Sequence, residues 1–328
     1  MIDFLTDKAI VQNDKTYDHI KKGRNLLTFA EVLKNIMDKK PIDDAAWLIM
    51  IFLSLVWGCS FILIKKALIA FDPVQLACLR LGISSLAFSP FVFKFRKEIP
   101  WKDWSKFVAV GLTGSGIPAF LFSFAQTNIS SSVAGLLNSL TPIWTLLIGI
   151  FVFRLSFNKW KLIGVVLGFL GAASLIILGD QSSIGGNPIY GILIIIATIC
   201  YASSVNMVQA FFGNIRPIII SSMSFFLIGP PAIIYLFLTD FTTVLKTNSN
   251  VMLSFGAVTT LSLMGTFLAS ILFYNLVQRT NAVFASTVTY LMPIVALAWG
   301  IIDGEMVGIL HFIGMSTILI GVYITKKA

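Results

Sequence analysis

Residues 130–149 read "SSSVAGLLNSLTPIWTLLIG", and residues 281–300 read "NAVFASTVTYLMPIVALAWG". Both stretches lead from small and polar residues through apolar ones to a central proline, Pro142 in the first and Pro293 in the second. The two prolines are 151 positions apart, close to half of the 328-residue chain. A chain that repeats itself at half length within apolar segments is typical of a duplicated membrane protein.

The likeness extends beyond these two stretches. Four more pairs of residues recur at a similar separation: Gly164 with Gly314, Gly171 with Gly321, Trp57 with Tyr201, and Pro73 with Pro217. Between the halves lies the polar, glycine-rich stretch "GDQSSIGGNP" at 179–188. We therefore assign residues 47–178 to a first repeat of five helices, 179–187 to a linker and 188–326 to a second repeat.

The composition places the chain in a bilayer. Hydrophobic residues make up 57% of it and charged residues only 12%, about half of the charge that a soluble domain carries. Ten apolar stretches approach the roughly 20 residues that cross a bilayer as a helix: 47–70, 74–93, 104–125, 130–153, 159–178, 188–210, 217–238, 252–275, 281–301 and 307–325. Lipid offers the backbone no hydrogen-bond partner, so the spans must be helical.

The fold class predicted from these observations is an all-α membrane protein. Its ten transmembrane helices form two five-helix repeats around a central cavity. An odd number of spans in each half inverts the second repeat relative to the first.

The charges on the loops predict the orientation. With the N-terminus placed inside, 20 of the 24 Lys and Arg residues fall on the inner side, and only Lys65, Lys66 and Lys246 fall outside. Arg80 is the one that lies within a span. By the positive-inside rule we expect a multi-pass protein of the plasma (inner) membrane with both termini cytoplasmic. The same rule accounts for the net charge of +9, so we predict no nucleic-acid partner.

Residues 1–46 differ from the rest because they are rich in charge. The segment "NLLTFAEVLKNIMDKK" at 25–40 spaces its apolar residues as a helix does. We interpret residues 1–46 as a cytoplasmic N-terminal extension. It either carries one amphipathic helix at a membrane surface or is a poorly ordered tail.

The sequence contains no recognisable catalytic or metal centre. The predicted spans hold no Asp or Glu, and the three cysteines, Cys59, Cys78 and Cys200, lack the spacing of metal ligands. There is also no zinc-binding histidine pair, phosphate-binding loop or paired-carboxylate motif. We predict that the protein is not an enzyme and has no metal and no cofactor. The missing intramembrane acid favours facilitated diffusion or exchange over proton coupling.

Arg80 is the single residue with the strongest case for a functional role. It lies about seven residues into the second predicted span, roughly 10 Å deep at 1.5 Å per residue. A charge at such depth costs roughly 2.5–3.5 kcal/mol on insertion scales. Either it faces the cavity as a fixed positive charge that attracts a carboxylate or sets selectivity, or its stem reaches outward to the headgroups or bonds carbonyls structurally.

The two prolines predict weak points in their helices. Proline lacks a backbone donor, which frees the carbonyl four residues earlier, here that of Asn138 and of Thr289. We interpret Pro142 and Pro293 as helix hinges and the polar residues beside them as cavity walls, with a plain packing kink as the alternative. The complete set of candidate substrate-binding residues is Trp57, Ser60, Arg80, Asn138, Ser139, Tyr201, Ser204, Tyr274, Thr289 and Tyr290.

Small residues on two other spans predict close helix contacts. They are Gly164, Gly168, Gly171, Gly314 and Gly321. Glycines at helical spacing let backbones approach closely. We assign them to helix packing, with a homodimer contact as the alternative.

A family resemblance follows from three stretches: "WGCSFILIKKALIAFDPVQLACLRL" at 57–81, "SLTPIWTLLIG" at 139–149 and "DGEMVGILHFIGMSTILIGVYI" at 303–324. Together they resemble EamA-type members of the drug/metabolite transporter superfamily over about residues 47–326. The matching positions are Trp57, Gly58, Ser60, Phe61, Lys65, Pro73, Arg80, Glu305, Gly314 and Gly321. Where that family often has Gly-Glu, the first repeat reads "VFRLSFNKW" at 152–160, so this acid stands only in the second repeat.

The resemblance implies ten helices, a central cavity and alternating access. It implies a secondary transporter for a small polar metabolite, an amino acid or similar, working as a facilitator or exchanger. Members of the family export or import amino acids, nucleotides or other metabolites, so the expected partners are a small-molecule substrate and the lipid bilayer. The alternative is a membrane-embedded sensor or scaffold that signals through the N-terminal extension.

Overall fold

The computed structural model describes residues 44–153, 160, 163–164, 166–171, 189–305 and 308–327. Within these residues every regular element is a helix. In the first half they are α4 (Asp44–Ala67), α5 (Pro73–Lys94), the short η1 (Trp101–Asp103), α6 (Trp104–Gly111), η2 (Leu112–Gly116), α7 (Ile117–Ala125), α8 (Ser131–Asn138) and α9 (Thr141–Phe153). The amphipathic segment predicted at 25–40 lies outside the described residues.

The second half adds a further series of helices. Its elements are α12 (Ile189–Phe211), α13 (Pro217–Phe237), α14 (Phe241–Thr247), α15 (Val251–Ser262), η3 (Leu263–Leu268), α16 (Ala269–Arg279), α17 (Ala282–Ser286), η4 (Thr287–Tyr290), α18 (Met292–Ile302) and α19 (Ile309–Lys327).

Eight helical stretches of the described chain are long and apolar enough to cross a membrane. They correspond to eight of the ten predicted spans, and they extend the prediction by a few residues at several ends. The tenth predicted span coincides with α19, of which the described stretch Ile309–Gly321 is a shorter apolar helix. The fifth, predicted at 159–178, lies largely outside the described residues.

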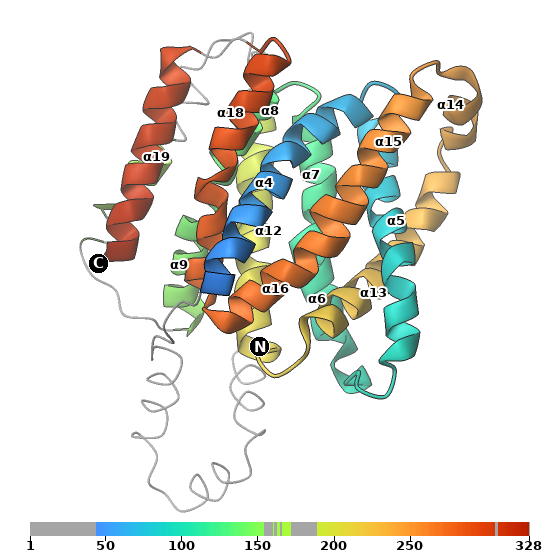
Figure 1. Ribbon diagram of the computed structural model, residues 1–328, viewed down its shortest axis with the longest axis horizontal. Helices are drawn as coiled ribbons and strands as arrows, with labels where there is room; N and C mark the ends of the chain where they lie inside the picture. The colour runs from blue at the N-terminus through green and yellow to red at the C-terminus, as the bar shows by residue number, and fades with distance from the viewer. Residues whose placement is uncertain are drawn as a thin grey trace, which may run out of the picture.

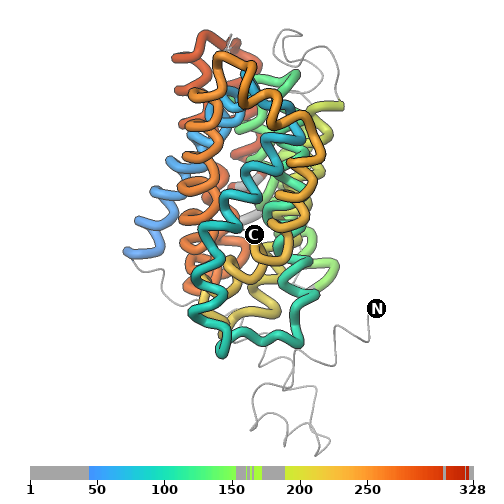
Figure 2. Tube along the Cα trace, turned by 90° about the vertical axis from the view of Figure 1, so that its right-hand side faces the viewer, coloured from blue at the N-terminus to red at the C-terminus, as the bar shows by residue number. Residues whose placement is uncertain are grey.

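The two halves are interleaved rather than set side by side. The helices run between two ends of the molecule (Figures 1 and 2), and the most extensive helix contact is that of α5 with α13. In the same way α12 packs on α7 and α9, and α18 packs on α4 and α8. Most of the large interfaces thus join a helix of the first half to one of the second.

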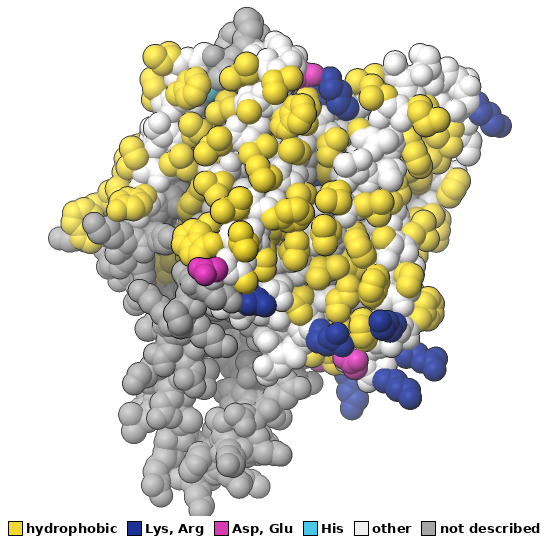
Figure 3. All heavy atoms as spheres, in the orientation of Figure 1, with side chains coloured by type: hydrophobic (Ala, Val, Ile, Leu, Met, Phe, Trp, Pro, Cys, Tyr) yellow, Lys and Arg dark blue, Asp and Glu magenta, His cyan; other side chains and the backbone are white. Residues whose placement is uncertain are grey.

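The outer face carries the apolar surface expected for lipid contact. Large side chains such as Phe151, Leu238 and Met252 are exposed, and yellow apolar atoms cover the visible middle of the molecule in Figure 3 while Lys and Arg gather mainly towards its ends. Hydrocarbon chains are as apolar as these side chains, so the exposure costs little in a bilayer. The protein is an integral, multi-pass membrane protein.

Both proline-containing helices are interrupted just before the proline. α8 ends at Asn138, and the chain makes a turn before Pro142. In the second half α17 gives way to the 3-10 turn η4 before Pro293. The Asn138 carbonyl accepts from Thr141 Oγ1 at 2.8 Å, and the Thr289 carbonyl accepts from Ser139 Oγ at 3.2 Å. Hydroxyl groups therefore satisfy both carbonyls that the prolines free.

Two further interruptions were not expected from the sequence. The predicted spans 104–125 and 252–275 each contain a π-helical segment, η2 and η3. A π segment inserts an extra residue into a helix and is frequent at functional sites. Gly114 in η2 and Gly265 in η3 are 151 positions apart, the same separation as the two prolines.

Close helix contacts predict a stability difference between two glycine substitutions. A Cβ on Gly58 in α4 would lie 2.5 Å from Val295 Cβ in α18, whereas a Cβ on Gly256 would meet nothing within 4 Å. We expect Gly58→Leu to lower the unfolding free energy by about 1–3 kcal/mol through overpacking. Gly256→Ala should leave it unchanged or raise it by up to about 1 kcal/mol. Thermal unfolding in detergent measures both, and equal melting of the two variants would contradict this packing of α4 on α18.

Candidate functional site

A cavity of about 100 Å³ lies between helices of the two halves. Its polar walls are formed by Trp57, Ser60, Arg80, Ser115, Asn138, Thr141, Tyr201, Ser204, Thr266, Ser270, Tyr274, Ser286 and Thr289. Its apolar walls are formed by Phe61, Ile64, Phe122, Val205, Phe273, Val288 and Met292, with Gly114 and Gly265 completing the lining. Hydroxyl and aromatic groups dominate the polar part.

The structure brings most of the candidate residues together. Eight of the ten line this one cavity: Trp57, Ser60, Arg80, Asn138, Tyr201, Ser204, Tyr274 and Thr289. Ser139 and Tyr290 are not among the lining residues. The Ser139 hydroxyl is used at the helix break instead, as a donor to the Thr289 carbonyl. That any of the ten binds a substrate stays a prediction.

Arg80 points inward from α5 and is held by the opposite half. Its Nε donates to Thr266 Oγ1 of η3 at 2.9 Å, and its side chain also interacts with that of Tyr201. The side chain therefore lies at the cavity wall, and its role there as a fixed charge for a substrate stays a prediction. Among the described residues that line the cavity, Arg80 is the single charged side chain. The cavity consequently has a positive charge without an acidic counterpart on its described walls.

The two π segments bring backbone close to the cavity. Trp57 Nε1 donates to the Gly265 carbonyl in η3 at 2.8 Å, and a Cβ on Gly265 would lie 2.9 Å from Ser60 Oγ. On the other side, a Cβ on Gly114 in η2 would lie 2.5 Å from Ser204 Oγ. The close approach of α4 to η3 and of α12 to η2 favours a residue without a side chain at both positions.

Asn138 adds an unpaired acceptor to the wall. Its side chain is 3% exposed, and its Nδ2 contacts Met292 Sδ at 3.7 Å. Its Oδ1 is buried without a hydrogen-bond partner among the described residues. A buried unpaired polar atom costs about 1–3 kcal/mol. A hydrogen-bond donor in the cavity, from water or a solute, would recover that cost.

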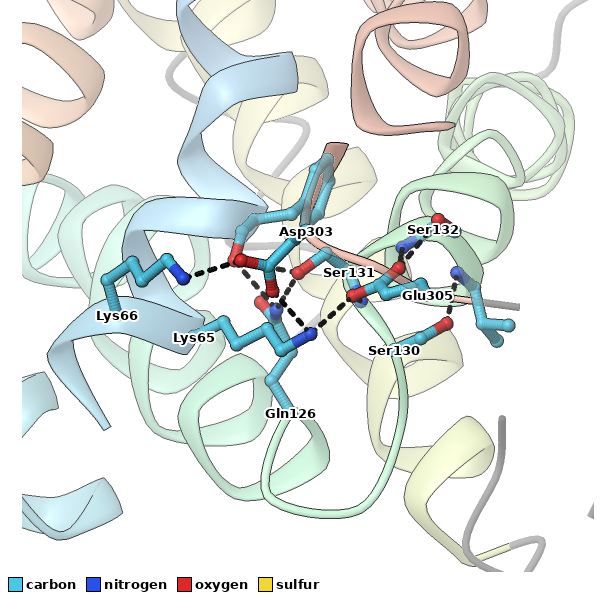
Figure 4. A network of polar contacts seen from close by, with 10 residues as sticks. Lys65, Lys66, Gln126, Ser130, Ser131, Ser132, Asp303 and Glu305 are labelled. Carbon is cyan, nitrogen blue, oxygen red and sulfur yellow. Dashed lines mark hydrogen bonds and ion pairs between the residues drawn. The ribbon is translucent and has the colours of Figure 1, made fainter. Parts of the chain in front are cut away.

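An ion-pair cluster lies at the end of the molecule where α4 and α18 finish (Figure 4). Lys65 Nζ lies 2.7 Å from Asp303 Oδ2 and 3.0 Å from Glu305 Oε1, and Lys66 Nζ lies 2.5 Å from Asp303 Oδ1. Glu305 also accepts hydrogen bonds from the start of α8, at Ser131 and Ser132. The charge count placed both lysines on the outer side of the membrane and gave no partner for them.

The environment shifts the pKa values of both acids. Hydrogen bonds from Lys65 and then Lys66 lower the pKa of Asp303 below its ordinary value. Burial acts to raise the pKa of Glu305, but hydrogen bonds from Ser132, Lys65 and the Ser131 backbone more than offset it, so this pKa is also lowered. Both carboxylates are therefore charged at neutral pH.

The glycines assigned to packing lie between neighbouring segments. A Cβ on Gly171 would lie 2.9 Å from the Gly314 carbonyl, and a Cβ on Gly321 would lie 2.5 Å from the Gly164 carbonyl. Gly168 lies against Ile143 of α9. These positions leave no room for a side chain. Whether a second copy of the chain also uses this face stays untested.

Sequence reasoning missed the π segments and the residues that they bring to the cavity. These are Gly114, Ser115, Gly265, Thr266 and, just beyond η3, Ser270. A usable signal was present, because Gly114-Ser115 and Gly265-Thr266 recur at the separation of the prolines. Helical periodicity alone gave no sign of an inserted residue.

Comparison with known proteins supports a common architecture. The family model described as "EamA-like transporter family" matches twice, at residues 45–177 and 189–326. A solved crystal structure superposes with a TM-score of 0.61 at 16% identity, covering 85% of this chain and 95% of the other, which shows a shared fold alone.

Three curated relatives illustrate the range of similarity. An "uncharacterized transporter" of Archaeoglobus fulgidus is 27% identical over 86% of this chain and 98% of its own length. A "probable amino-acid metabolite efflux pump" of Escherichia coli K12 is 27% identical over 82% of this chain and 90% of its own. The "uncharacterized inner membrane transporter YedA" of the same strain is 23% identical over 82% and 87%.

The lowered pKa of Asp303 gives a prediction for acid stability. We expect Asp303→Asn to lower the melting temperature at pH 7, because it removes the partner of Lys65 and Lys66. A carboxylate whose pKa is lowered on folding contributes fully above its ordinary value, here 3.8, and loses that contribution as the pH falls through its folded value. The melting difference between wild type and variant should therefore be constant from pH 7 to 5 and shrink below about pH 4.

The matched control is Glu98→Gln. Glu98 pairs with Arg216 at 3.4 Å, and both side chains are more than half exposed, so its removal should change stability by less than about 1 kcal/mol. If the melting difference between wild type and Asp303→Asn grows as the pH falls, the stabilising role assigned to the charged Asp303 is contradicted.

Proposed function

Because this chain belongs to the EamA-like transporter family, we propose that it is a secondary transporter that moves a small polar metabolite across the membrane by alternating access. The single observation that carries this proposal is the polar cavity, which lies between helices of both halves inside an apolar bundle. Polar side chains at such depth are costly and are typical of a solute pathway.

The architecture that we propose is ten helices in two inverted repeats. Two matches of one family model, two interrupted proline helices and two π segments at one separation support it. In such transporters one repeat rocks against the other around a site near the bilayer midplane. Pro142 and Pro293 are then the hinges, because the helices next to them are already broken.

The substrate that we propose carries a carboxylate, as an amino acid does. The guanidinium of Arg80 supplies planar, charged hydrogen-bond donors in the cavity. Guanidinium groups pair with carboxylates through two parallel hydrogen bonds. Asn138 Oδ1 would accept from the ammonium group of the same solute. The name of the related Escherichia coli efflux pump supports the same substrate class.

The mode that we propose is facilitated diffusion or exchange. The described walls of the cavity contain no carboxylate, whereas proton or sodium coupling commonly uses one at membrane depth. We further propose that both termini are cytoplasmic, since the end that carries α4's first residues also has the larger number of basic loop residues.

Substitution of Arg80 tests the substrate assignment. Purified protein is first screened by thermal shift against amino acids, other carboxylates, amines and neutral polyols, and the stabilising solute is then used for uptake into liposomes. We expect a carboxylate to stabilise the protein. Arg80→Ala should reduce its uptake by roughly tenfold or more, as for the loss of a charged hydrogen bond. Arg80→Lys should retain part of the uptake, because lysine keeps the positive charge but lacks the planar guanidinium that forms two parallel hydrogen bonds.

The matched control is Arg279→Ala, which removes an exposed arginine at the end of α16 and should leave uptake unchanged. If a folded Arg80→Ala protein takes up the same carboxylate at the wild-type rate, Arg80 does not bind the substrate carboxylate. Stabilisation by amines or polyols alone would refute the substrate class.

A further inference from the structure

We propose that Lys65, Ser131, Ser132 and Glu305 form a latch that closes one end of the cavity and separates when the cavity opens there. Towards the opposite end, the equivalent positions Gln209 and Ala282 are joined by a neutral hydrogen bond. The latch rests on the proposed alternating access, but its test needs no substrate.

The centre of the latch is a carboxylate of the second half bound to a helix start of the first. Glu305 accepts from Ser131 N at 2.9 Å, from Ser132 N at 3.1 Å and from Ser132 Oγ at 2.7 Å. These backbone groups have no partner inside α8, because the first amides of a helix point out of its end. A negative charge at this position is favoured by the helix dipole as well.

Lys65 brings a third element into the same contact. Its ammonium group, at the end of α4, lies between Glu305 and Asp303 (Figure 4). The Glu305 side chain is only 6% exposed. Loss of Lys65 would leave this buried carboxylate charge without its partner, which is strongly destabilising. The latch therefore resists separation of α4, α8 and the segment after α18.

Two glycines allow Glu305 to reach α8. Gly304 has φ +80°, a left-handed conformation that favours glycine. This turn lets the Glu305 N–H donate to the Gly300 carbonyl at 2.8 Å and returns the side chain toward α8. At Gly300 a Cβ would collide with Ser132 Oγ. The backbone after α18 is thus shaped around the contact.

The latch adjoins the cavity directly. Ile64 lines the cavity, and Lys65 is the next residue of α4. At the other edge, α8 begins at Ser131 and ends at Asn138, which also lines the cavity. Movement of α8 at the latch would therefore be transmitted along a two-turn helix to the cavity wall. This is why we assign the cluster to cavity closure rather than to loop stability alone.

Towards the other end, the positions equivalent to Lys65 and Ser131 form an uncharged contact. Ala282 is the first residue of α17, as Ser131 is of α8, and its N–H donates to Gln209 Oε1 at 2.6 Å. Gln209 follows Lys65 by 144 positions, the separation of Trp57 and Tyr201, while Ala282 follows Ser131 by 151, that of the prolines. A neutral amide thus stands at the position that corresponds to Lys65.

Cysteine labelling tests the latch. In a background with Cys59, Cys78 and Cys200 changed to Ala, Ser60→Cys places a thiol in the cavity. A membrane-impermeant maleimide is applied from each side of sealed vesicles. Two single-cysteine proteins, prepared separately, identify the sides of the vesicle. Lys246→Cys marks the side of the latch, and Lys97→Cys marks the opposite side. Glu305→Gln should raise the labelling rate from the latch side by roughly tenfold and lower it from the opposite side.

Further variants separate the latch from general damage. Lys65→Gln should act in the same direction, and the double variant should add little, because the two residues belong to one contact. Ser132→Ala, which removes only a hydroxyl, should give a smaller increase and covers the case in which Glu305→Gln does not fold. Glu98→Gln, which breaks the exposed ion pair with Arg216, should leave both rates unchanged.

The outcomes distinguish this proposal from the proposed function. Unchanged labelling from the latch side in folded Ser132→Ala and Glu305→Gln proteins would overturn the latch, even if Arg80→Ala abolishes transport. If the latch variants shift the labelling but Arg80→Ala transports normally, the latch is supported and the proposed substrate class is refuted. If the Ser60→Cys thiol is reachable from both sides at once while the latch residues are unchanged, the latch and alternating access are both overturned.

Discussion

The need to satisfy backbone hydrogen bonds inside hydrocarbon governs this molecule. Among the spans that the structure describes, two contain π segments and two are interrupted before a proline, so carbonyls are freed inside the bundle. The Gly265 carbonyl is bound by Trp57, and the Thr289 carbonyl is bound by Ser139. Both donors come from the other half. Because lipid provides no donors, these carbonyls draw polar side chains to the centre of the bundle, and the cavity forms where they meet.

Much of this arrangement follows from the sequence, for reasons that can be stated. Length and hydropathy fix the spans, since a bilayer has one thickness. Proline at 142 and 293 marks the helix breaks, because a missing N–H acts locally. Arg80 was marked as a candidate by its depth alone. Each of these signals is carried by a single residue or by one continuous stretch, so no knowledge of neighbours was required.

Other features depended on neighbours and could not be predicted in this way. A π segment differs from an α-helix by one inserted residue, which periodicity over a short window does not resolve. Ser139 was expected on the cavity wall, but its hydroxyl is taken by the Thr289 carbonyl of the other half. The pairing of Lys65 with Glu305 joins residues 240 positions apart. Such contacts are decided by how the halves interleave.

The interleaving has a consequence for biogenesis. During synthesis α4 and α5 leave the ribosome long before α13, α16 and α18, on which they pack. Until then Trp57 lacks its carbonyl acceptor and Arg80 lacks the Thr266 hydroxyl. The early helices must therefore wait in the membrane, or beside the insertion machinery, with unmatched polar groups. Final assembly belongs to the completed chain, because a nascent half released too early lacks most of the large interfaces of the native molecule.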